Sequence, residues 1–176
     1  MYLLTTISWC REEGVNKIVM KHEQWFHEAA KTATQGFCER DRCGAVIVKD
    51  STIIGSGYNA PPGDDTKTAK CRFEYLAEIR KPKSDRTCCV HAEWRAILDA
   101  LRRNPEKLIG STLYFARVDE NGKNLFSGDP YCTVCSRLAL DTGIRHFALW
   151  REEDIRVYDT VEYNDLSYQF FHPKKS

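Results

Sequence analysis

Two kinds of apolar pattern follow one another in the first half of the chain. From Glu23 onward, apolar residues recur at helical spacing, which predicts a helix with one apolar face. The predicted face comprises Phe26, Ala29, Ala30, Ala33 and Phe37. Residues 43–50 then form a nearly continuous, β-branched apolar run, which is typical of a buried strand. A turn at Asp50-Ser51 and a second apolar run over residues 52–59 predict a β-hairpin.

Helices and strands alternate through the second half. From His91 the apolar spacing is again helical, and Asn104-Pro105 ends this helix. Its predicted apolar face comprises Trp94, Ile97, Leu98 and Leu101. The remaining predicted elements are a strand at 111–118, an Asn-Gly turn at 120–124, a helix from about Thr133 to Gly143, a strand at 145–150, and past Arg151 a strand DIRVYD and an amphipathic helix. This order predicts an α/β fold, a three-layer α/β/α sandwich around a mixed sheet of about five strands, the later ones parallel.

A long polar insertion separates the hairpin from the second helix. Residues 60–90 open with APPGDD and include a stretch, 73–81, that fits a short helix. The insertion carries seven basic residues: Lys67, Lys70, Arg72, Arg80, Lys81, Lys83 and Arg86. It is either a functional loop or a solvated surface segment. We divide the chain into an N-terminal extension, residues 1–22, and one domain, residues 23–176.

Composition narrows the choice of function. The net charge of +1 gives no strong field for a nucleic-acid backbone, and no apolar run approaches the ~20 residues of a membrane span. The start of the chain has no basic segment of the kind that precedes a secretion signal. We therefore expect a cytoplasmic protein whose eight cysteines are reduced, with a few disulfides as the alternative.

Three residues have the chemistry of a zinc site. Cys132 and Cys135 are three residues apart at the predicted start of a helix, where backbone N–H groups favour thiolates. His91 also stands at a helix start. If the two helix N-termini meet, one imidazole and two thiolates surround a single ion and leave the fourth position open, as a catalytic zinc requires.

Glu93 follows His91 at an offset of two, so the two side chains do not share one face of a helix. A carboxylate beside the metal, but not bound to it, can hold a water molecule and shuttle its proton. Hydrolytic deamination needs this, because the ring nitrogen and the leaving amine of an amidine-like ring must be protonated.

A closed structural zinc is the competing interpretation. Cys88 precedes His91 by three residues, so Cys88 (or Cys89) would complete a four-ligand site with the Cys132–Cys135 pair. In that case the chain would be a non-catalytic, zinc-stabilised binding module.

The motifs favour the catalytic interpretation, because from about residue 23 to 150 the chain resembles the cytidine deaminase superfamily. CGAVIV is similar to its first strand, GSGYNAPP to its second strand and following loop, and VHAE and PYCTVC to its two zinc motifs. The resemblance implies a cytidine deaminase-like fold with zinc ligands His91, Cys132 and Cys135 and with Glu93 as proton shuttle. It further implies substrate contacts at Asn59, whose alternative role is that of a turn residue, and at Ala92.

The long insertion is most similar to that of the deoxycytidylate deaminases, so we expect hydrolysis of dCMP to dUMP with release of ammonia. A purine-base or transfer-RNA adenosine deaminase is the alternative within the superfamily. Tyr131, which separates Pro130 from Cys132, and Val90, which separates Cys89 from His91, depart from the usual motifs. Cys71, Cys88 and Cys89 could hold a second, structural zinc, but they show no further ligand pair, so we expect one catalytic Zn²⁺ per chain. The resemblance also implies a homo-oligomer that acts on a small nucleotide or nucleoside.

Overall fold

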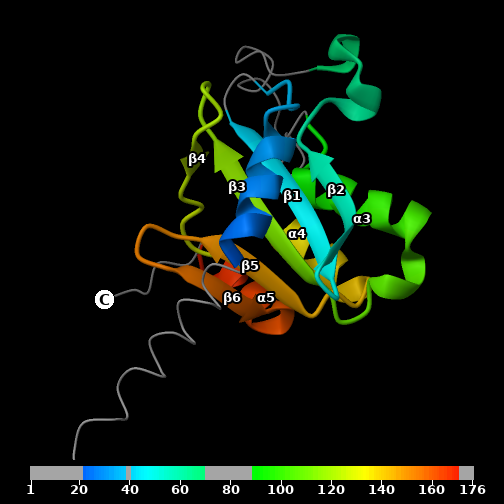
Figure 1. Ribbon diagram of the computed structural model, residues 1–176, viewed down its shortest axis with the longest axis vertical. Helices are drawn as coiled ribbons and strands as arrows, with labels where there is room; N and C mark the ends of the chain where they lie inside the picture. The colour runs from blue at the N-terminus through cyan, green and yellow to red at the C-terminus, as the bar shows by residue number, and fades with distance from the viewer. Residues whose placement is uncertain (1–21, 39–40, 70–88, 171–176) are drawn as a thin grey trace, which may run out of the picture.

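A mixed β-sheet forms the middle layer of the protein (Figure 1). The structure, a computed structural model, describes residues 22–38, 41–69 and 89–170. The strands are β1 (Arg42–Lys49), β2 (Thr52–Tyr58), β3 (Thr112–Val118), β4 (Asn124–Leu125), β5 (His146–Trp150) and β6 (Ile155–Asp159). They lie in the order β2-β1-β3-β5-β6, with the short β4 paired to β3. The predicted sheet of about five strands is confirmed, with the two-residue β4 as a sixth.

Strand direction agrees with the prediction at one pairing and departs from it at another. β3 and β5 are parallel, as the intervening helix requires, whereas β5 and β6 are antiparallel. β6 follows β5 after a short turn, in which the Arg151 N–H donates to the Asp154 carbonyl over 2.8 Å. A connection this short can join only antiparallel neighbours, so the expected parallel arrangement does not extend to β6.

Helices cover both faces of the sheet. A helix over residues 22–33 lies on one face, and three helices lie on the other (Figure 1). These three helices are α3 (Ala92–Arg103), α4 (Thr133–Asp141) and α5 (Thr160–Gln169). Short 3-10 helices occur at Pro62–Asp64, Thr66–Thr68 and Pro105–Lys107. Along β1, Ala45 and Ile47 pack toward α3, while Val46 and Val48 pack toward the helix over residues 22–33. Burial on both faces explains why this strand is continuously apolar.

Glycines let helices approach the sheet closely. A Cβ placed on Gly57 would collide with the backbone of Ala92 and Ala96 in α3. On the opposite face of the sheet, a Cβ on Gly44 would collide with the backbone of Ala29 and Ala33. The small residues of β1 and β2 therefore set how deeply the helices are seated.

The predicted apolar face of α3 is wrong. Trp94, Leu98 and Leu101 are 39%, 44% and 41% exposed, so of the four predicted residues only Ile97 is buried. The buried face consists of Ala92, Glu93, Ala96, Ile97 and Ala100. Because α3 packs against the glycines of β2, the contact accepts alanine rather than large side chains, and these turn outward.

Phe37 does not extend the first apolar face either. Helical structure ends at residue 33, and Phe37 is 53% exposed beside Tyr58, with ring centroids 6.5 Å apart. Three further predictions concern segments outside the described residues. The helix predicted over residues 73–81 and six of the seven basic residues of the insertion lie wholly outside them. The predicted N-terminal extension, residues 1–22, lies outside them except for its last residue. Among the helices that the structure describes, none is long and apolar enough to cross a membrane.

Candidate active site

Two helices begin at the same point above the sheet. His91 is the N-terminal cap of α3, and Cys132 is the N-terminal cap of α4, each with extended backbone. The Cys132 Sγ accepts a hydrogen bond from the backbone N–H of Cys135 over 3.3 Å. Both helix N-termini present N–H groups to the space between them, and such an arrangement favours anionic groups, including thiolates.

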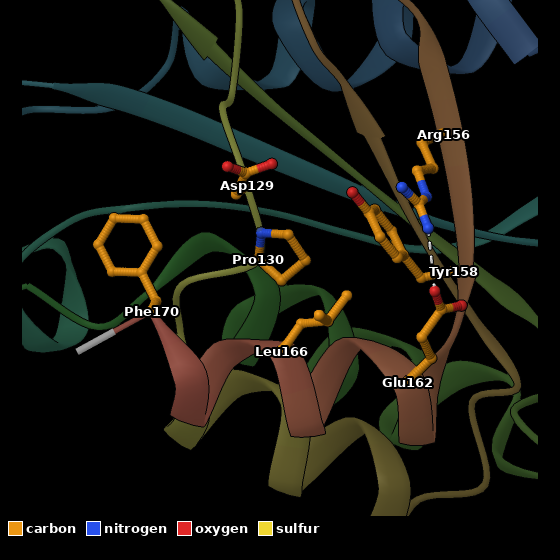
Figure 2. A pocket seen from close by; sticks show the side chains of 7 residues that line it. All are labelled: Asp129, Pro130, Arg156, Tyr158, Glu162, Leu166 and Phe170. Atoms are coloured by element: carbon orange, nitrogen blue, oxygen red, sulfur yellow. Dashed lines mark hydrogen bonds and ion pairs between the residues drawn. The ribbon is translucent and has the colours of Figure 1, made fainter. Parts of the chain in front are cut away.

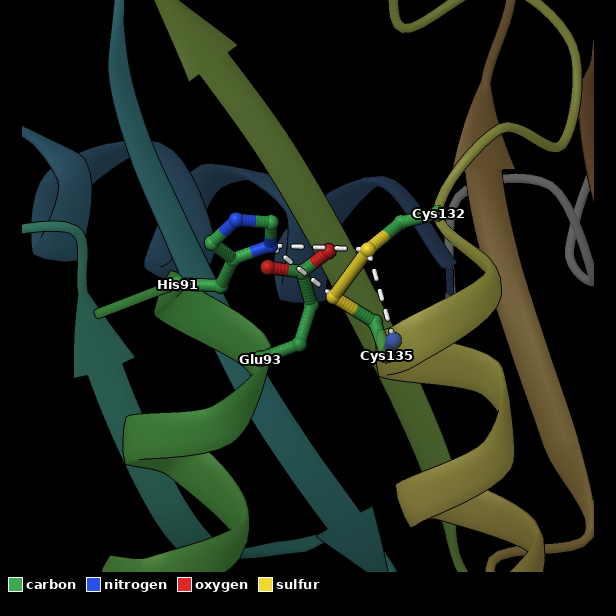
Figure 3. A group of neighbouring side chains, drawn as sticks. All are labelled: His91, Glu93, Cys132 and Cys135. Carbon is green, nitrogen blue, oxygen red and sulfur yellow. Dashed lines mark hydrogen bonds between the residues drawn. A yellow bond between two sulfur atoms is a disulfide. The ribbon is translucent and has the colours of Figure 1, made fainter. Parts of the chain in front are cut away.

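Four side chains with metal-binding chemistry converge in this space (Figure 3). His91 Nδ1 lies 3.1 Å from Cys135 Sγ and 3.4 Å from Cys132 Sγ. Together with a Glu93 carboxylate oxygen, these donor atoms all lie within 4.8 Å of one another. The structure thus brings together the four residues singled out in the sequence, although their roles as ligands and proton shuttle remain predictions.

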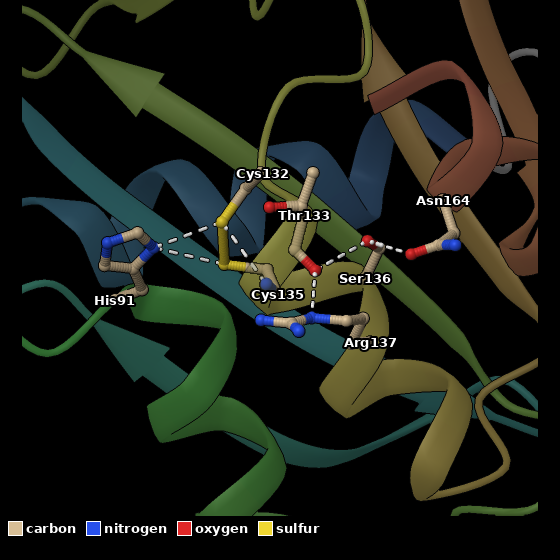
Figure 4. Close-up of a disulfide and its surroundings, with 7 residues drawn as sticks. All are labelled: His91, Cys132, Thr133, Cys135, Ser136, Arg137 and Asn164. Carbon is tan, nitrogen blue, oxygen red and sulfur yellow. Dashed lines mark hydrogen bonds between the residues drawn. A yellow bond between two sulfur atoms is a disulfide. The ribbon is translucent and has the colours of Figure 1, made fainter. Parts of the chain in front are cut away.

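The two cysteines are joined as a disulfide, with Cα atoms 5.3 Å apart (Figure 4). The sequence predicts reduced thiols, so the structure differs from that expectation at this pair. A Cys-x-x-Cys turn holds its two sulfur atoms within bonding reach, which makes both the oxidised and the reduced pair accessible. Only the reduced pair supplies the thiolates that bind a metal ion.

Glu93 is buried beside the histidine and the two cysteines. Glu93 is only 5% exposed. Burial raises the pKa of its carboxyl above the ordinary value of 4.5, and the charge of nearby His91 lowers this pKa in part. Burial, followed by the charge of Glu93, also raises the pKa of the Cys43 thiol on β1. The raised pKa favours the protonated form of Glu93, which is the form that can donate a proton to a bound substrate.

The donor set fits zinc. One imidazole nitrogen and two sulfur atoms lie within 4.8 Å of one another, and these three atoms are the ligand set of an open zinc site. Cys89, the described candidate for a fourth thiolate, is outside this group, and Cys88 lies outside the described residues. Within the described part of the chain, the cluster therefore has two cysteines and not the three of a closed site.

Asn59 has a visible structural role at the end of β2. Its Oδ1 accepts a hydrogen bond from the Cys43 N–H over 2.9 Å, and its Nδ2 donates to the Asp41 carbonyl over 2.8 Å. These bonds join the end of β2 to the start of β1. Ala92, the other residue expected to contact substrate, has no exposed surface in the first turn of α3. Substrate contact at both positions stays a prediction.

Arg95 is a residue that sequence reasoning missed. Its Nη1 pairs with Asp64 Oδ1 at 2.7 Å, its Nη2 donates to the Pro61 carbonyl at 2.9 Å, and its guanidinium lies 5.3 Å from the centre of the Tyr58 ring. The side chain fastens the beginning of the insertion to α3, two residues beyond Glu93. No spacing rule could have identified it, because its partners lie more than thirty positions away in the sequence.

A separate hollow of about 330 Å³ lies beyond the turn that precedes Cys132 (Figure 2). It is lined by Asp129, Pro130, Arg156, Tyr158, Glu162, Leu166 and Phe170. None of the four converging residues borders it, and Arg156 is paired with Glu162 at 3.0 Å. The histidine–cysteine cluster and this hollow are therefore separate features of the protein.

A mixed sheet that presents a histidine, two cysteines and a buried glutamate at paired helix N-termini defines the class of zinc-dependent hydrolytic deaminases. The comparisons with known proteins agree. The family model described as the cytidine and deoxycytidylate deaminase zinc-binding region matches residues 19–150. The chain belongs to this family and is a hydrolytic deaminase.

Individual relatives support this assignment. The deoxycytidylate deaminase of Mycobacterium phage D29 is 33% identical over 129 residues, which cover 70% of this chain and 89% of that protein. The dCMP deaminase of cyanophage S-TIM5, solved in complex with dCMP and dUMP, has a TM-score of 0.52 at 21% identity, over 72% of this chain and 77% of the other. Cytidine deaminase from Burkholderia pseudomallei has a TM-score of 0.51 at 16% identity, over 81% and 94%. The two solved structures establish a shared fold.

Proposed function

We propose that this chain is a zinc-dependent deaminase of cytosine nucleotides and that its preferred substrate is deoxycytidylate. The observation that carries the proposal is the convergence of His91 Nδ1, the two cysteine Sγ atoms and the buried Glu93 carboxylate within 4.8 Å. The choice of nucleotide is supported by the 33% identity to a phage deoxycytidylate deaminase. The net reaction adds water to the ring carbon that bears the amine and releases ammonia, which converts dCMP to dUMP.

In this proposal His91, Cys132 and Cys135 hold one zinc ion per chain, with both thiols reduced. A bound zinc ion acts as a Lewis acid that makes a water molecule acidic enough to react near neutral pH. The need for reduced thiols also favours a cytoplasmic location, which stays a prediction.

Glu93 moves the protons. It takes a proton from the attacking water and delivers it to the ring nitrogen, and it then protonates the leaving amine. Its burial suits this task, because the raised pKa brings the carboxyl closer to the pH at which it must both accept and donate. Asn59 and the first turn of α3 at Ala92 are the proposed contacts to the nucleoside part of the substrate.

Glu93→Gln tests the mechanism. The amide keeps the shape of the side chain but cannot carry a proton, so we expect turnover to fall by about 10²–10⁴-fold while one zinc per chain is retained. Ammonia release gives the turnover, and elemental analysis gives the zinc content. Wild-type turnover in this variant would overturn the mechanism, and loss of zinc would make Glu93 a ligand instead.

Substrate choice is tested by ammonia release from cytosine, cytidine, deoxycytidine, the 5′-monophosphates of these two nucleosides, guanine and adenosine. We expect a 5′-phosphate to raise kcat/KM for deoxycytidine by at least about tenfold, since one charge-assisted contact contributes ~1.5–3 kcal/mol. Part of this preference should decrease with added salt. Equal efficiency on deoxycytidine and dCMP would refute the nucleotide assignment, and a preference for guanine or adenosine would support the purine alternative.

A homo-oligomer is the remaining part of the proposal. It is supported by the exposed stripe Trp94, Leu98 and Leu101, which follows one face of α3 at spacings of four and three residues. Two copies of such a stripe are self-complementary about a two-fold axis. A second copy of this chain would therefore cover it, beside the helix that begins at the metal site.

A further inference from the structure

The two ends of the long insertion are joined at its base. The Ala60 N–H donates to the Val90 carbonyl over 3.4 Å, and the Val90 N–H donates to the Ala60 carbonyl over 2.9 Å. A residue pair that exchanges both bonds has its Cα atoms about 5.5 Å apart. Ala60 directly follows Asn59, and Val90 directly precedes His91. The bridge therefore holds the proposed substrate contact Asn59 close to the proposed metal ligand His91.

A cluster of side chains braces the insertion beside this bridge. Arg95 lies at the start of α3, where its backbone N–H donates to the His91 carbonyl over 3.1 Å. Its side chain reaches the other end of the bridge: Nη2 donates to the Pro61 carbonyl over 2.9 Å, and Nη1 pairs with Asp64 Oδ1 at 2.7 Å. The second oxygen of Asp64 accepts a hydrogen bond from the Tyr58 hydroxyl over 3.2 Å. The contacts of Arg95 thus tie the start of the insertion to the first turn of α3.

The chain bends sharply where it meets Arg95. Gly63 and Asp64 have positive φ values of 68° and 58°. Residues other than glycine seldom adopt this conformation, although aspartate tolerates it better than most. The side chains of Arg95 and Asp64 are 18% and 42% exposed, so water screens their ion pair less than it screens a fully exposed one. The ion pair therefore helps to hold the bend in place.

We propose that Arg95 and Asp64 are positioning residues for substrate binding, which hold the start of the insertion, and with it Asn59, at a fixed place beside His91. The inference rests on the proposed function, in which Asn59 contacts the substrate and His91 binds the metal. Neither Arg95 nor Asp64 belongs to the group of four converging side chains. The close seat of α3 on Gly57 fixes the helix side of the contact, so the insertion side is the part that moves when the contact is lost.

This role predicts a particular kinetic change. Without the contact, the segment after β2 samples several positions, and substrate binds to the fraction of molecules in which the segment is correctly placed. The apparent affinity falls by that fraction, so KM rises. Once substrate is bound, the segment is in place, and kcat stays nearly unchanged. A merely structural role would lower thermal stability without this separation of KM from kcat.

Arg95→Ala is the main test. With the best cytosine substrate of the wild type, we expect KM to rise about tenfold, because charge-assisted hydrogen bonds are lost, while kcat stays within about twofold. One zinc per chain should be retained, as measured by elemental analysis. Arg95→Lys should lie between Arg95→Ala and wild type, because lysine keeps the charge but not the forked donor. Arg102→Ala, an exposed arginine of the same helix, is the matched control and should keep the wild-type KM.

Asp64→Asn tests the other half of the contact and carries the test if Arg95→Ala does not fold. Asparagine keeps the shape of the side chain and tolerates positive φ, but it lacks the charge. We expect KM to rise in the same direction as in Arg95→Ala. The double variant should be no worse than Arg95→Ala alone, because the two side chains form one contact. Asp65→Asn is the control, since the Asp65 carboxylate accepts from the Lys67 N–H over 2.9 Å.

Hydrogen exchange reports on the bridge without any catalysis. The Val90 amide should exchange faster in Arg95→Ala than in wild type, because its bond to Ala60 opens more often when the insertion is not held. Metal-free, reduced protein below its melting temperature provides this comparison.

The outcomes separate the two proposals. A wild-type protein that releases no ammonia from any cytosine substrate would overturn the proposed function and this inference with it. An active wild type together with an unchanged KM in folded Arg95→Ala, or in Asp64→Asn, would overturn the inference alone. Unchanged exchange at Val90, loss of zinc in Arg95→Ala, or an equal rise of KM in Arg102→Ala would also overturn it, because the contact would then not act on the substrate side of the site.

Discussion

At the scale of single residues, Glu93 is an acidic side chain that is almost fully buried. Because burial raises its folded pKa above the ordinary 4.5, the folded state holds this proton more tightly than the unfolded state does. In the metal-free protein the Glu93 carboxyl therefore lowers the free energy of unfolding as the pH rises from about 4.5 through the folded pKa. Each unit of difference between the folded and the unfolded pKa changes this free energy by about 1.4 kcal/mol.

Glu93→Gln removes this titration. We expect the metal-free variant to be more stable than the metal-free wild type at pH 7, and the difference to shrink toward pH 4.5. Urea unfolding of both proteins across this range, with thiols reduced and a chelator present, provides the measurement. Stability curves that stay parallel at all pH values would show that the carboxyl is not held in its neutral form by burial.

The cysteines give a second prediction at this scale. Cys132→Ser or Cys135→Ser should abolish tight zinc binding, because a neutral hydroxyl is a poor replacement for a thiolate in a three-ligand site. Cys89→Ser is the control and should keep one zinc and full turnover, since Cys89 is outside the converging group. Loss of zinc in Cys89→Ser, or in Cys88→Ser, would instead favour the closed structural site.

At the scale of elements, the seat of α3 on β2 decides where His91 and Glu93 lie. A methyl group at position 57 would meet the backbone of Ala92 and Ala96, which cannot move without the helix. We expect Gly57→Ala to lower the free energy of unfolding by about 1–3 kcal/mol. It should also reduce kcat/KM, by up to about 10²-fold, because a displacement near 1 Å is enough for such a loss.

Ser56→Ala on the same strand is the matched control. Ser56 bonds to α3 through its backbone N–H, which donates to Asp99 Oδ2 over 2.9 Å, and the substitution keeps this group. Its stability and activity should stay near those of wild type. Thermal unfolding and ammonia release measure both effects. If Gly57→Ala behaves like Ser56→Ala, the close approach of helix and strand does not constrain the site.

At the scale of the whole molecule, the outward stripe of α3 predicts self-association. Leu98→Glu places a charge in the middle of the stripe, so the mass measured by light scattering should fall toward the 20.3 kDa of one chain. Val161→Glu, at another exposed apolar position, on α5, is the control and should keep the wild-type mass. A wild-type protein that already measures as a single chain would refute the homo-oligomer.

The sequence by itself determined the type and order of most elements and the residues that could carry chemistry. Strand β1 could be predicted because burial on both faces leaves a continuous apolar run. The end of α4 could be predicted because a helix often ends at a residue with positive φ, which favours glycine, and Gly143 has a φ of 78°. His91, Glu93, Cys132 and Cys135 were readable because metal chemistry restricts both residue type and local spacing. These are local signals, each contained within a few neighbouring positions.

Only the tertiary structure decided which side of α3 is buried, because the answer depends on glycines in β2 that are distant in the sequence. It likewise decided that Asn59 joins two strand ends and that Arg95 fastens the insertion. It decided the contact between Ser136 of α4 and Asn164 of α5 for the same reason, because this hydrogen bond joins positions 28 residues apart. Apolar periodicity reports how far each residue is from water, but not which partner covers it, and that partner is chosen only when the layers pack together.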